Sequence, residues 1–198
     1  PQACADEGER VVENLGYDAI KFDLDVPSGH EKDRANRHIR NPEIDHKVEI
    51  VEAVTERVGD RADVAFDCHW SFTGGSAKRL AEALEPYDVW WLEDPVPPEN
   101  HDVQKTVTHS TSTPIAVGEN VYRKFGQRTL LEPQAVDIVA PDLPRVGGMR
   151  ETRKIADLAD MYYIPVAMHN VSSPIGTVAS AHVGAAGAWP SPRRPASA

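Results

Sequence analysis

The sequence predicts an α/β fold, an incomplete TIM (β/α)-barrel with about six of the eight strands that a closed barrel needs. Two observations support this prediction. Short apolar runs alternate with amphipathic helical patterns through most of the 198 residues, which is typical of parallel β/α architecture. The chain is also shorter than the roughly 250 residues typical of a complete barrel.

The expected strands are the apolar runs, each followed by a loop that carries charged or polar residues. They are Ala19–Leu24, Val64–Asp67, Val89–Leu92, Pro114–Val117, Val136–Ala140 and Ile164–Met168. A helix over 2–15 is expected before the first strand, and a helix of small residues over 173–186 after the last. We therefore expect one strand to be missing at each end.

Helical periodicity fills the segments between these runs. In the helix expected over 44–58, apolar residues recur at three- and four-residue spacing and so share one face; they are Ile44, Val48, Val51, Val54 and Val58. Ser76 is the expected N-cap of the next helix. A further helix is expected after Gly147 and Gly148.

The chain is expected to form one domain with a short tail. We assign residues 1–186 to a partial barrel domain. Residues 187–198, GAWPSPRRPASA, are rich in proline and have no apolar periodicity. This predicts a disordered tail, and an aberrant end produced by a frameshift fits equally well. The chain begins at Pro1 rather than Met, so we expect that its natural start is missing.

Composition excludes several classes of function. The net charge of −10 argues against nucleic-acid and anionic-membrane partners, because a protein of this sign repels phosphate. Two cysteines, Cys4 and Cys68, make neither a disulfide framework nor a zinc site. With no signal peptide and no apolar run of membrane-spanning length, a cytoplasmic location is the simplest expectation.

Three acidic residues occupy the ends of successive expected strands. Asp67, Glu93 and Glu119 follow one another at an even spacing of 26 residues, from 67 to 93 and from 93 to 119. Strand C-termini of a β/α barrel open onto one face, so these carboxylates are expected to converge there. A hard divalent cation would relieve their repulsion, and Mg²⁺ prefers carboxylate oxygens. The alternative is that such acids cap helices or face solvent.

The next two strands end in an acid and a base. Asp142 and His169 can form a hydrogen-bonded pair in which the carboxylate fixes the imidazole tautomer and raises its basicity. His69 lies two residues after Asp67, so strand alternation would place it on the same side. It could be a metal ligand, a structural histidine or an acid near the metal. Lys21 could face the opposite side of the site or be solvated.

These motifs resemble the strand-end motifs of the enolase superfamily, in particular its mandelate-racemase-like subgroup. The similar segments are GYDAIKFDLD, DCHW, WLEDP, VGEN, PDLPRVGG and HN, from about residue 16 to 184. The resemblance implies that Asp67, Glu93 and Glu119 bind Mg²⁺, with Asp94 as an alternative to Glu93. It also implies that Asp142 and His169 form the general-base dyad.

The arrangement of Asp67 and His69 is similar to that of galactonate and gluconate dehydratases, in which this histidine is the general acid. The resemblance therefore implies dehydration of a small sugar acid through an enediolate to a 2-keto-3-deoxy acid. An epimerase or racemase with His169 and Lys21 as opposing bases is the runner-up, although the second lysine of the racemases is replaced by Asp23. The family's N-terminal capping domain has no counterpart here. A third interpretation is that this chain is a non-catalytic remnant. For the full-length parent, a homo-oligomer is also left open.

Overall fold

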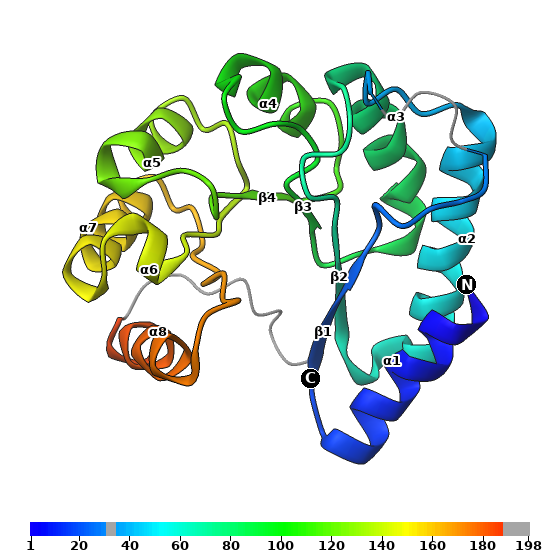
Figure 1. The fold of residues 1–198 in the computed structure, drawn as a ribbon, viewed down its shortest axis with the longest axis horizontal. Helices are drawn as coiled ribbons and strands as arrows, with labels where there is room; N and C mark the ends of the chain where they lie inside the picture. Colours follow the sequence, from blue (N-terminus) through cyan, green and yellow to red (C-terminus); the bar gives the residue numbers. More distant parts are fainter. Residues whose placement is uncertain (31–34, 188–198) are drawn as a thin grey trace. The chain divides into compact units, whose positions relative to one another are not determined.

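The computed structural model describes residues 1–30 and 35–187, and the chain divides into two compact units (Figure 1). The first unit contains residues 1–97 and 106–115, and the second contains residues 98–105 and the described residues from 116 onward. Helix α4 (His101–Thr108) and strand β4 (Ile115–Val117) contribute residues to both.

The first unit contains three parallel strands that follow the chain order. Strand β1 (Ala19–Asp23) pairs with β2 (Asp63–Asp67), and β2 pairs with the two-residue strand β3 (Leu92–Glu93). The register places Asp23 opposite Asp67, and Asp67 opposite Glu93. Three acidic residues thus end three neighbouring strands at the same level.

Three α-helices accompany these strands, and in Figure 1 α1 (Gln2–Leu15) runs beside α2 (Asn41–Val58). The third is α3 (Gly74–Leu84), and short 3₁₀ turns follow α2 (Gly59–Arg61) and α3 (Glu85–Tyr87). The expected apolar face of α2 is mostly buried, but Val48 is only half-buried, whereas Ile50 and Lys47 are buried.

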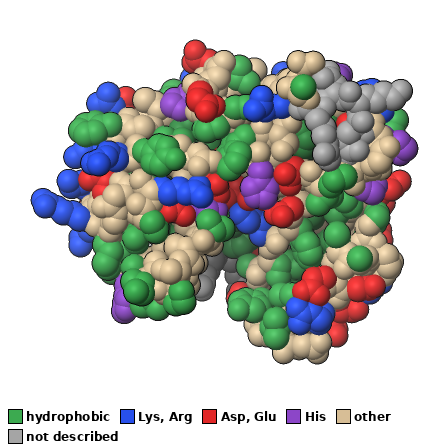
Figure 2. All heavy atoms as spheres, in the orientation of Figure 1, with side chains coloured by type: hydrophobic (Ala, Val, Ile, Leu, Met, Phe, Trp, Pro, Cys, Tyr) green, Lys and Arg blue, Asp and Glu red, His purple; other side chains and the backbone are tan. Residues whose placement is uncertain are grey.

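The surface of α1 carries much of the unit's charge. Figure 2 shows acidic and basic side chains next to one another over this helix. The Arg57 guanidinium of α2 lies 2.9 Å from a carboxylate oxygen of Asp6 and 3.1 Å from one of Glu9. Such exposed pairs contribute little to stability, so the packing of α1 depends mainly on its buried face.

The second unit continues the same alternation. Strand β4 pairs in parallel with β5 (Ile138–Val139). Its helices are α5 (Arg123–Leu131), α6 (Leu143–Val146), α7 (Met149–Asp160) and α8 (Pro174–Ala186). The sixth expected strand, 164–168, does not form a regular strand. In the described chain this segment and the residue after it contribute only isolated bridges, Val139 to Val166 and Asp142 to His169.

Most expected elements are found, with two corrections. Five strands rather than six form in the described residues, because the last run makes single bridges and no ladder. Ser76 is not an N-cap: α3 begins after Thr73, whose hydroxyl accepts from the Ser76 backbone N–H at 3.2 Å. The helices expected over 2–15 and 173–186 are confirmed as α1 and α8, the latter with Ser173 as its N-cap. Apart from Gly187, the expected tail lies outside the described residues.

Across residues 1–30 and 35–187, no helix combines the length and the apolar character that crossing a membrane requires.

Gly118 joins β4 to the loop that carries Glu119, and its backbone lies directly against Ala140, the residue after β5. Its φ is +155°, and a Cβ built on it would lie 2.9 Å from the backbone C and N atoms of Ala140. We expect Gly118→Ala to push these backbones apart and weaken the hydrogen bond from Ala140 N to Val117 O. The expected cost is about 1–3 kcal/mol of unfolding free energy, measurable by urea denaturation.

Gly184→Ala is the matched control for this substitution. Gly184 lies within α8 of the same unit, and beyond its own helix a Cβ there would meet no heavy atom of the described residues within 4 Å. Because alanine is favoured over glycine inside helices, this variant should gain about 0.5–1 kcal/mol. An unchanged denaturation midpoint for Gly118→Ala would show that the two strands can separate without cost.

Candidate active site

Two acidic residues of the first unit share one lysine. Lys21 of β1 places its ammonium 2.7 Å from Asp67 Oδ2 and 2.8 Å from Glu93 Oε2. Both carboxylates are buried, and the lysine side chain is 35% exposed. Burial lowers the pKa of Lys21, but the charges of Glu93 and Asp67 outweigh it, so the net pKa lies above its usual value. Lys21 is therefore a partner of these acids.

Further contacts fix the orientation of the same carboxylates. The indole Nε1 of Trp91, two residues before Glu93, donates to Glu93 Oε2 at 2.9 Å. The backbone N–H of His69 donates to Asp67 Oδ1 at 3.0 Å. The two acids thus present oxygens to a single cation position, and this donor set fits a hard cation such as Mg²⁺.

His69 reaches the neighbourhood of Asp67 by a turn and not by strand alternation. Strand β2 ends at Asp67, and both His69 and Trp70 have positive φ, 42° and 58°. Because the strand ends at Asp67, strand alternation does not place His69, and that part of the sequence-based prediction is wrong. The imidazole Nε2 nevertheless lies 3.7 Å from Asp67 Oδ2.

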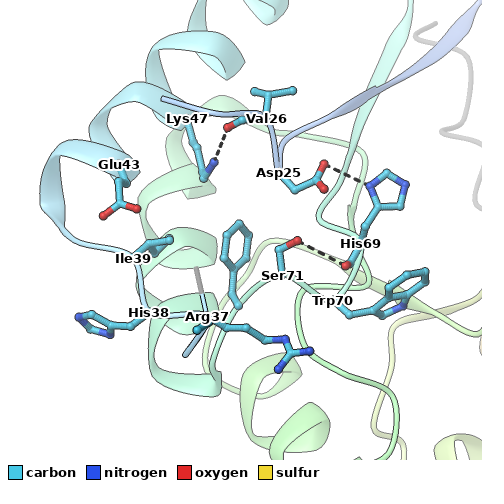
Figure 3. A pocket seen from close by; sticks show the side chains of 12 residues that line it. Asp25, Val26, Arg37, His38, Ile39, Glu43, Lys47, His69, Trp70 and Ser71 are labelled. Carbon is cyan, nitrogen blue, oxygen red and sulfur yellow. Dashed lines mark hydrogen bonds and ion pairs between the residues drawn. The ribbon is translucent and has the colours of Figure 1, made fainter. Parts of the chain in front are cut away.

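The other ring nitrogen of His69 lies against an aspartate of the loop after β1. Nδ1 is 3.2 Å from Asp25 Oδ1, and Figure 3 marks this contact between the two side chains. Burial lowers the pKa of His69, but the hydrogen bond to Asp25 and the charge of Asp67 outweigh it, so the net pKa is raised. The ligand atoms of Asp23, Asp25 and His69 all lie within 4.8 Å of one another.

A cavity of about 470 Å³ opens beside His69 within the first unit. Figure 3 shows His69 and Asp25 on one side of it and Lys47 and Glu43 on another. The wall is mixed: apolar side chains such as Phe72 and Ile39 lie beside ionisable ones, which also include Arg37 and His38. The cavity has room for a small polar molecule next to the imidazole.

In the second unit the structure brings together the expected pair of acid and base. His169 Nδ1 lies 2.9 Å from Asp142 Oδ2, and both side chains are buried. Asp142 is also the N-cap of α6, because its Oδ1 accepts from the Arg145 backbone N–H at 3.0 Å. The carboxylate is therefore fixed at one oxygen and holds the imidazole with the other.

Glu119 lies between two cationic groups of the same unit. His169 Nε2 forms a short ion-pair contact with Glu119 Oε2, and Arg145 Nη1 lies 2.9 Å from Oε1. Arg145 also donates to Asn120 Oδ1 at 2.9 Å. Burial raises the pKa of Glu119, but the contacts to His169 and Arg145 outweigh it and leave the pKa below its usual value.

Asp94 and Cys68 flank the acids of the first unit. Asp94, the alternative to Glu93, is buried with a φ of +42°, and its carbonyl accepts from the Trp70 N–H. Cys68 is fully buried, and burial raises the pKa of its thiol well above the usual value. It is therefore no nucleophile at neutral pH.

The sequence analysis did not identify four residues that hold the site side chains: Asp25, Lys47, Trp91 and Arg145. Two had a local signal. Trp91 lies two residues before Glu93, and Arg145 lies three residues after Asp142, within hydrogen-bonding reach of an N-cap. Asp25 and Lys47 act across 44 and 23 residues of sequence, and nothing local marks them.

The comparisons with known proteins agree on one family. Residues 3–192 match the model of the enolase C-terminal domain-like family. The D-xylonate dehydratase of Haloferax volcanii is 92% identical over 186 residues, which are 94% of this chain and 45% of that protein. The D-galactonate dehydratase family member RspA of Halomonas elongata is 33% identical over 91% of this chain and 50% of its own length.

A solved structure shows the same relationship. The mandelate racemase/muconate lactonizing enzyme-like protein of Rubrobacter xylanophilus matches with a TM-score of 0.85 and 48% identity, over 89% of this chain and 45% of that one. This chain thus spans about half the length of the curated relatives it matches. The predicted α/β fold of a partial barrel is confirmed by these matches, and the chain belongs to the enolase C-terminal domain-like family.

Proposed function

We propose that the protein is a Mg²⁺-dependent sugar-acid dehydratase, a carbon–oxygen lyase that converts an aldonate to a 2-keto-3-deoxy acid. The 92% identity to a D-xylonate dehydratase makes D-xylonate the first substrate to test. We place the reaction in the cytoplasm, because two cysteines make no disulfide framework.

The observation that carries the proposal is the buried pair of Asp142 and His169. A base that removes the α-proton of a carboxylate must keep one nitrogen unprotonated and aimed. The hydrogen bond of 2.9 Å between Nδ1 and Asp142 Oδ2 places a ring proton on Nδ1 and orients the ring. Nε2 contacts Glu119 Oε2, and it could accept the α-proton once that carboxylate bound the proposed metal ion instead. His169 Nε2 is thus the atom proposed to take the α-proton.

Magnesium is proposed to bind Asp67, Glu93 and Glu119. The support within the first unit is that Asp67 and Glu93 already direct oxygens at one cationic atom, Lys21 Nζ. Glu119 of the second unit is added on the family pattern. When bound, the ion would neutralise the charge that develops on the substrate carboxylate as the α-proton leaves.

His69 is the proposed acid for the second half of the reaction. As the bond between C3 and its hydroxyl oxygen breaks, His69 gives a proton from Nε2 to that oxygen, which leaves as water. The electron pair of the lost α-proton forms the double bond between C2 and C3. The resulting enol becomes the 2-keto-3-deoxy acid by tautomerisation, which needs no further residue.

The geometry does not favour the epimerase alternative. A lysine that acts as the second base needs a free amine. The Lys21 ammonium instead contacts Asp67 and Glu93 at 2.7 and 2.8 Å. These contacts make it a counter-ion of the acids.

The test uses the Haloferax volcanii enzyme with its matched segment replaced by the 186 residues of this chain that match it, so that the residues act within a full-length protein. With D-xylonate and Mg²⁺ we expect a keto-deoxy acid that reacts with semicarbazide, and no product after EDTA treatment. Recovery of substrate with an inverted α-carbon would indicate the epimerase. No product from any aldonate, with the unmodified enzyme active alongside, would refute the proposal.

Calorimetry of the isolated chain with Mg²⁺ tests whether this chain binds the ion without the rest of the protein.

A further inference from the structure

We propose that Asp25 is a positioning residue that orients His69 for proton delivery to the departing hydroxyl. This inference rests on the dehydratase function proposed above and deepens it. The chain then contains two Asp–His pairs with opposite tasks. Asp142 and His169 of the second unit take a proton, and Asp25 and His69 of the first unit give one.

The geometry singles out Asp25 among the acids near His69. Asp25 Oδ1 lies 3.2 Å from Nδ1, within hydrogen-bonding distance. The other two contacts involve Nε2 and are longer: 3.7 Å to Asp67 Oδ2 and 4.0 Å to Asp23 Oδ1. Those acids contribute charge, but among the described residues it is Asp25 whose hydrogen bond fixes the direction of the ring.

A buried lysine holds Asp25 in place. Lys47 of α2 is 4% exposed, and its ammonium donates to the carbonyl of Leu24 at 2.8 Å and to that of Val26 at 3.3 Å. These carbonyls belong to the residues on either side of Asp25. Figure 3 shows the Lys47 contact to Val26 and the Asp25 contact to His69 within the same cavity wall. The loop is thus tied to a helix on both sides of the carboxylate.

The backbone of His69 is fixed as well. Its N–H donates to Asp67 Oδ1 at 3.0 Å, and the next residue, Trp70, donates its N–H to the Asp94 carbonyl at 2.7 Å. With the main chain held, the ring orientation depends on Asp25. An Nδ1–H that donates to Asp25 leaves the transferable proton on Nε2. After transfer, His69 is neutral, still bonded to Asp25, and the hydroxyl has left as water.

The experiment removes the carboxylate and measures the two half-reactions separately in the chimeric enzyme. For Asp25→Ala we expect kcat for D-xylonate dehydration to fall about 10–100-fold, as for other residues that orient an imidazole, with KM changed less than about twofold. Exchange of the α-proton with D₂O, measured on the 3-deoxy analogue that cannot eliminate water, should stay at the wild-type rate.

Two companion measurements separate positioning from a general structural role. The 3-deoxy-3-fluoro substrate, whose fluoride leaves without protonation, should react with Asp25→Ala nearly as fast as with wild type. Asp25→Asn keeps an oxygen that can accept from Nδ1 and should recover part of kcat.

Asp23→Ala is the charge-matched control, because Asp23 is more exposed and lies beyond hydrogen-bonding distance of His69. It should retain kcat within about twofold.

Three outcomes would overturn the inference. Equal loss of exchange and elimination in Asp25→Ala would indicate a structural role. An equal effect of Asp23→Ala would show that charge alone matters. A raised Mg²⁺ requirement would assign Asp23, Asp25 and His69, whose ligand atoms lie within 4.8 Å of one another, to cation binding. An inactive chimera with wild-type residues would instead be a failure of the proposed function, and the semicarbazide assay detects it before any variant is made.

Discussion

Replacing His169 by asparagine is expected to stop removal of the substrate α-proton. The imidazole Nε2 is the proposed base, and Asp142 fixes its tautomer through a buried hydrogen bond of 2.9 Å. General-base catalysis of this kind contributes on the order of 10²–10⁴-fold, so dehydration should fall by at least that factor. Exchange of the α-proton of the 3-deoxy analogue with D₂O, followed by NMR in the chimeric enzyme, measures the affected step directly.

Asp142→Asn and His182→Asn are the companion variants. Asp142→Asn should slow the same exchange, because the imidazole loses the carboxylate that orients it. His182→Asn should leave the rate unchanged, since His182 is exposed on α8 of the same unit. A His169→Asn enzyme that exchanged the proton at the wild-type rate would assign the base to another residue.

Replacing Glu93 by glutamine is expected to remove most magnesium-dependent activity. Glu93 Oε2 is held by the Trp91 indole and lies 2.8 Å from the Lys21 ammonium, so the side chain stays in place while its charge is lost. Metal polarisation of a substrate oxygen is worth several kcal/mol, which corresponds to about 10³-fold or more in rate. We expect calorimetry to show weakened Mg²⁺ binding and the semicarbazide assay to show the loss of rate.

Glu82→Gln controls for the loss of one negative charge in the same unit. Glu82 is exposed on α3, so Mg²⁺ affinity and kcat should stay at wild-type values. Asp67→Asn should behave as Glu93→Gln does, because Asp67 contacts the same ammonium. Unchanged Mg²⁺ affinity in both Asp67→Asn and Glu93→Gln would show that the ion binds elsewhere.

The fold could be predicted from the sequence because its signals are local. Helical periodicity located α2, and a helix bounded at Gln2 and Leu15 appears as expected. The sixth strand was not predicted well, because an apolar run shows burial but not whether neighbours supply a continuous hydrogen-bond ladder. Cap positions failed for a similar reason: Thr73 and Ser76 are both good caps, and only backbone geometry decides between them.

The contacts among site residues were harder to predict, because they join distant parts of the chain. The ends of β1 and β2 are brought level by parallel register, so Lys21 meets Asp67 across 46 residues. The strand-end acids could be identified because they repeat at even spacing. Asp25 belongs to no such repeating pattern. Its partner His69 has a left-handed backbone conformation, which histidine adopts too rarely to be predicted from the sequence.

The contact of Lys21 with both Asp67 and Glu93 has a consequence for the order in which the protein is assembled. Two buried carboxylates that faced each other alone would oppose folding until an ion arrived. The ammonium supplies a positive charge from within the chain, so the strands can close first. On the proposed function, metal loading then brings a second cation to carboxylates that are already in place in a folded protein, and a shortage of magnesium would leave an idle enzyme rather than an unfolded one.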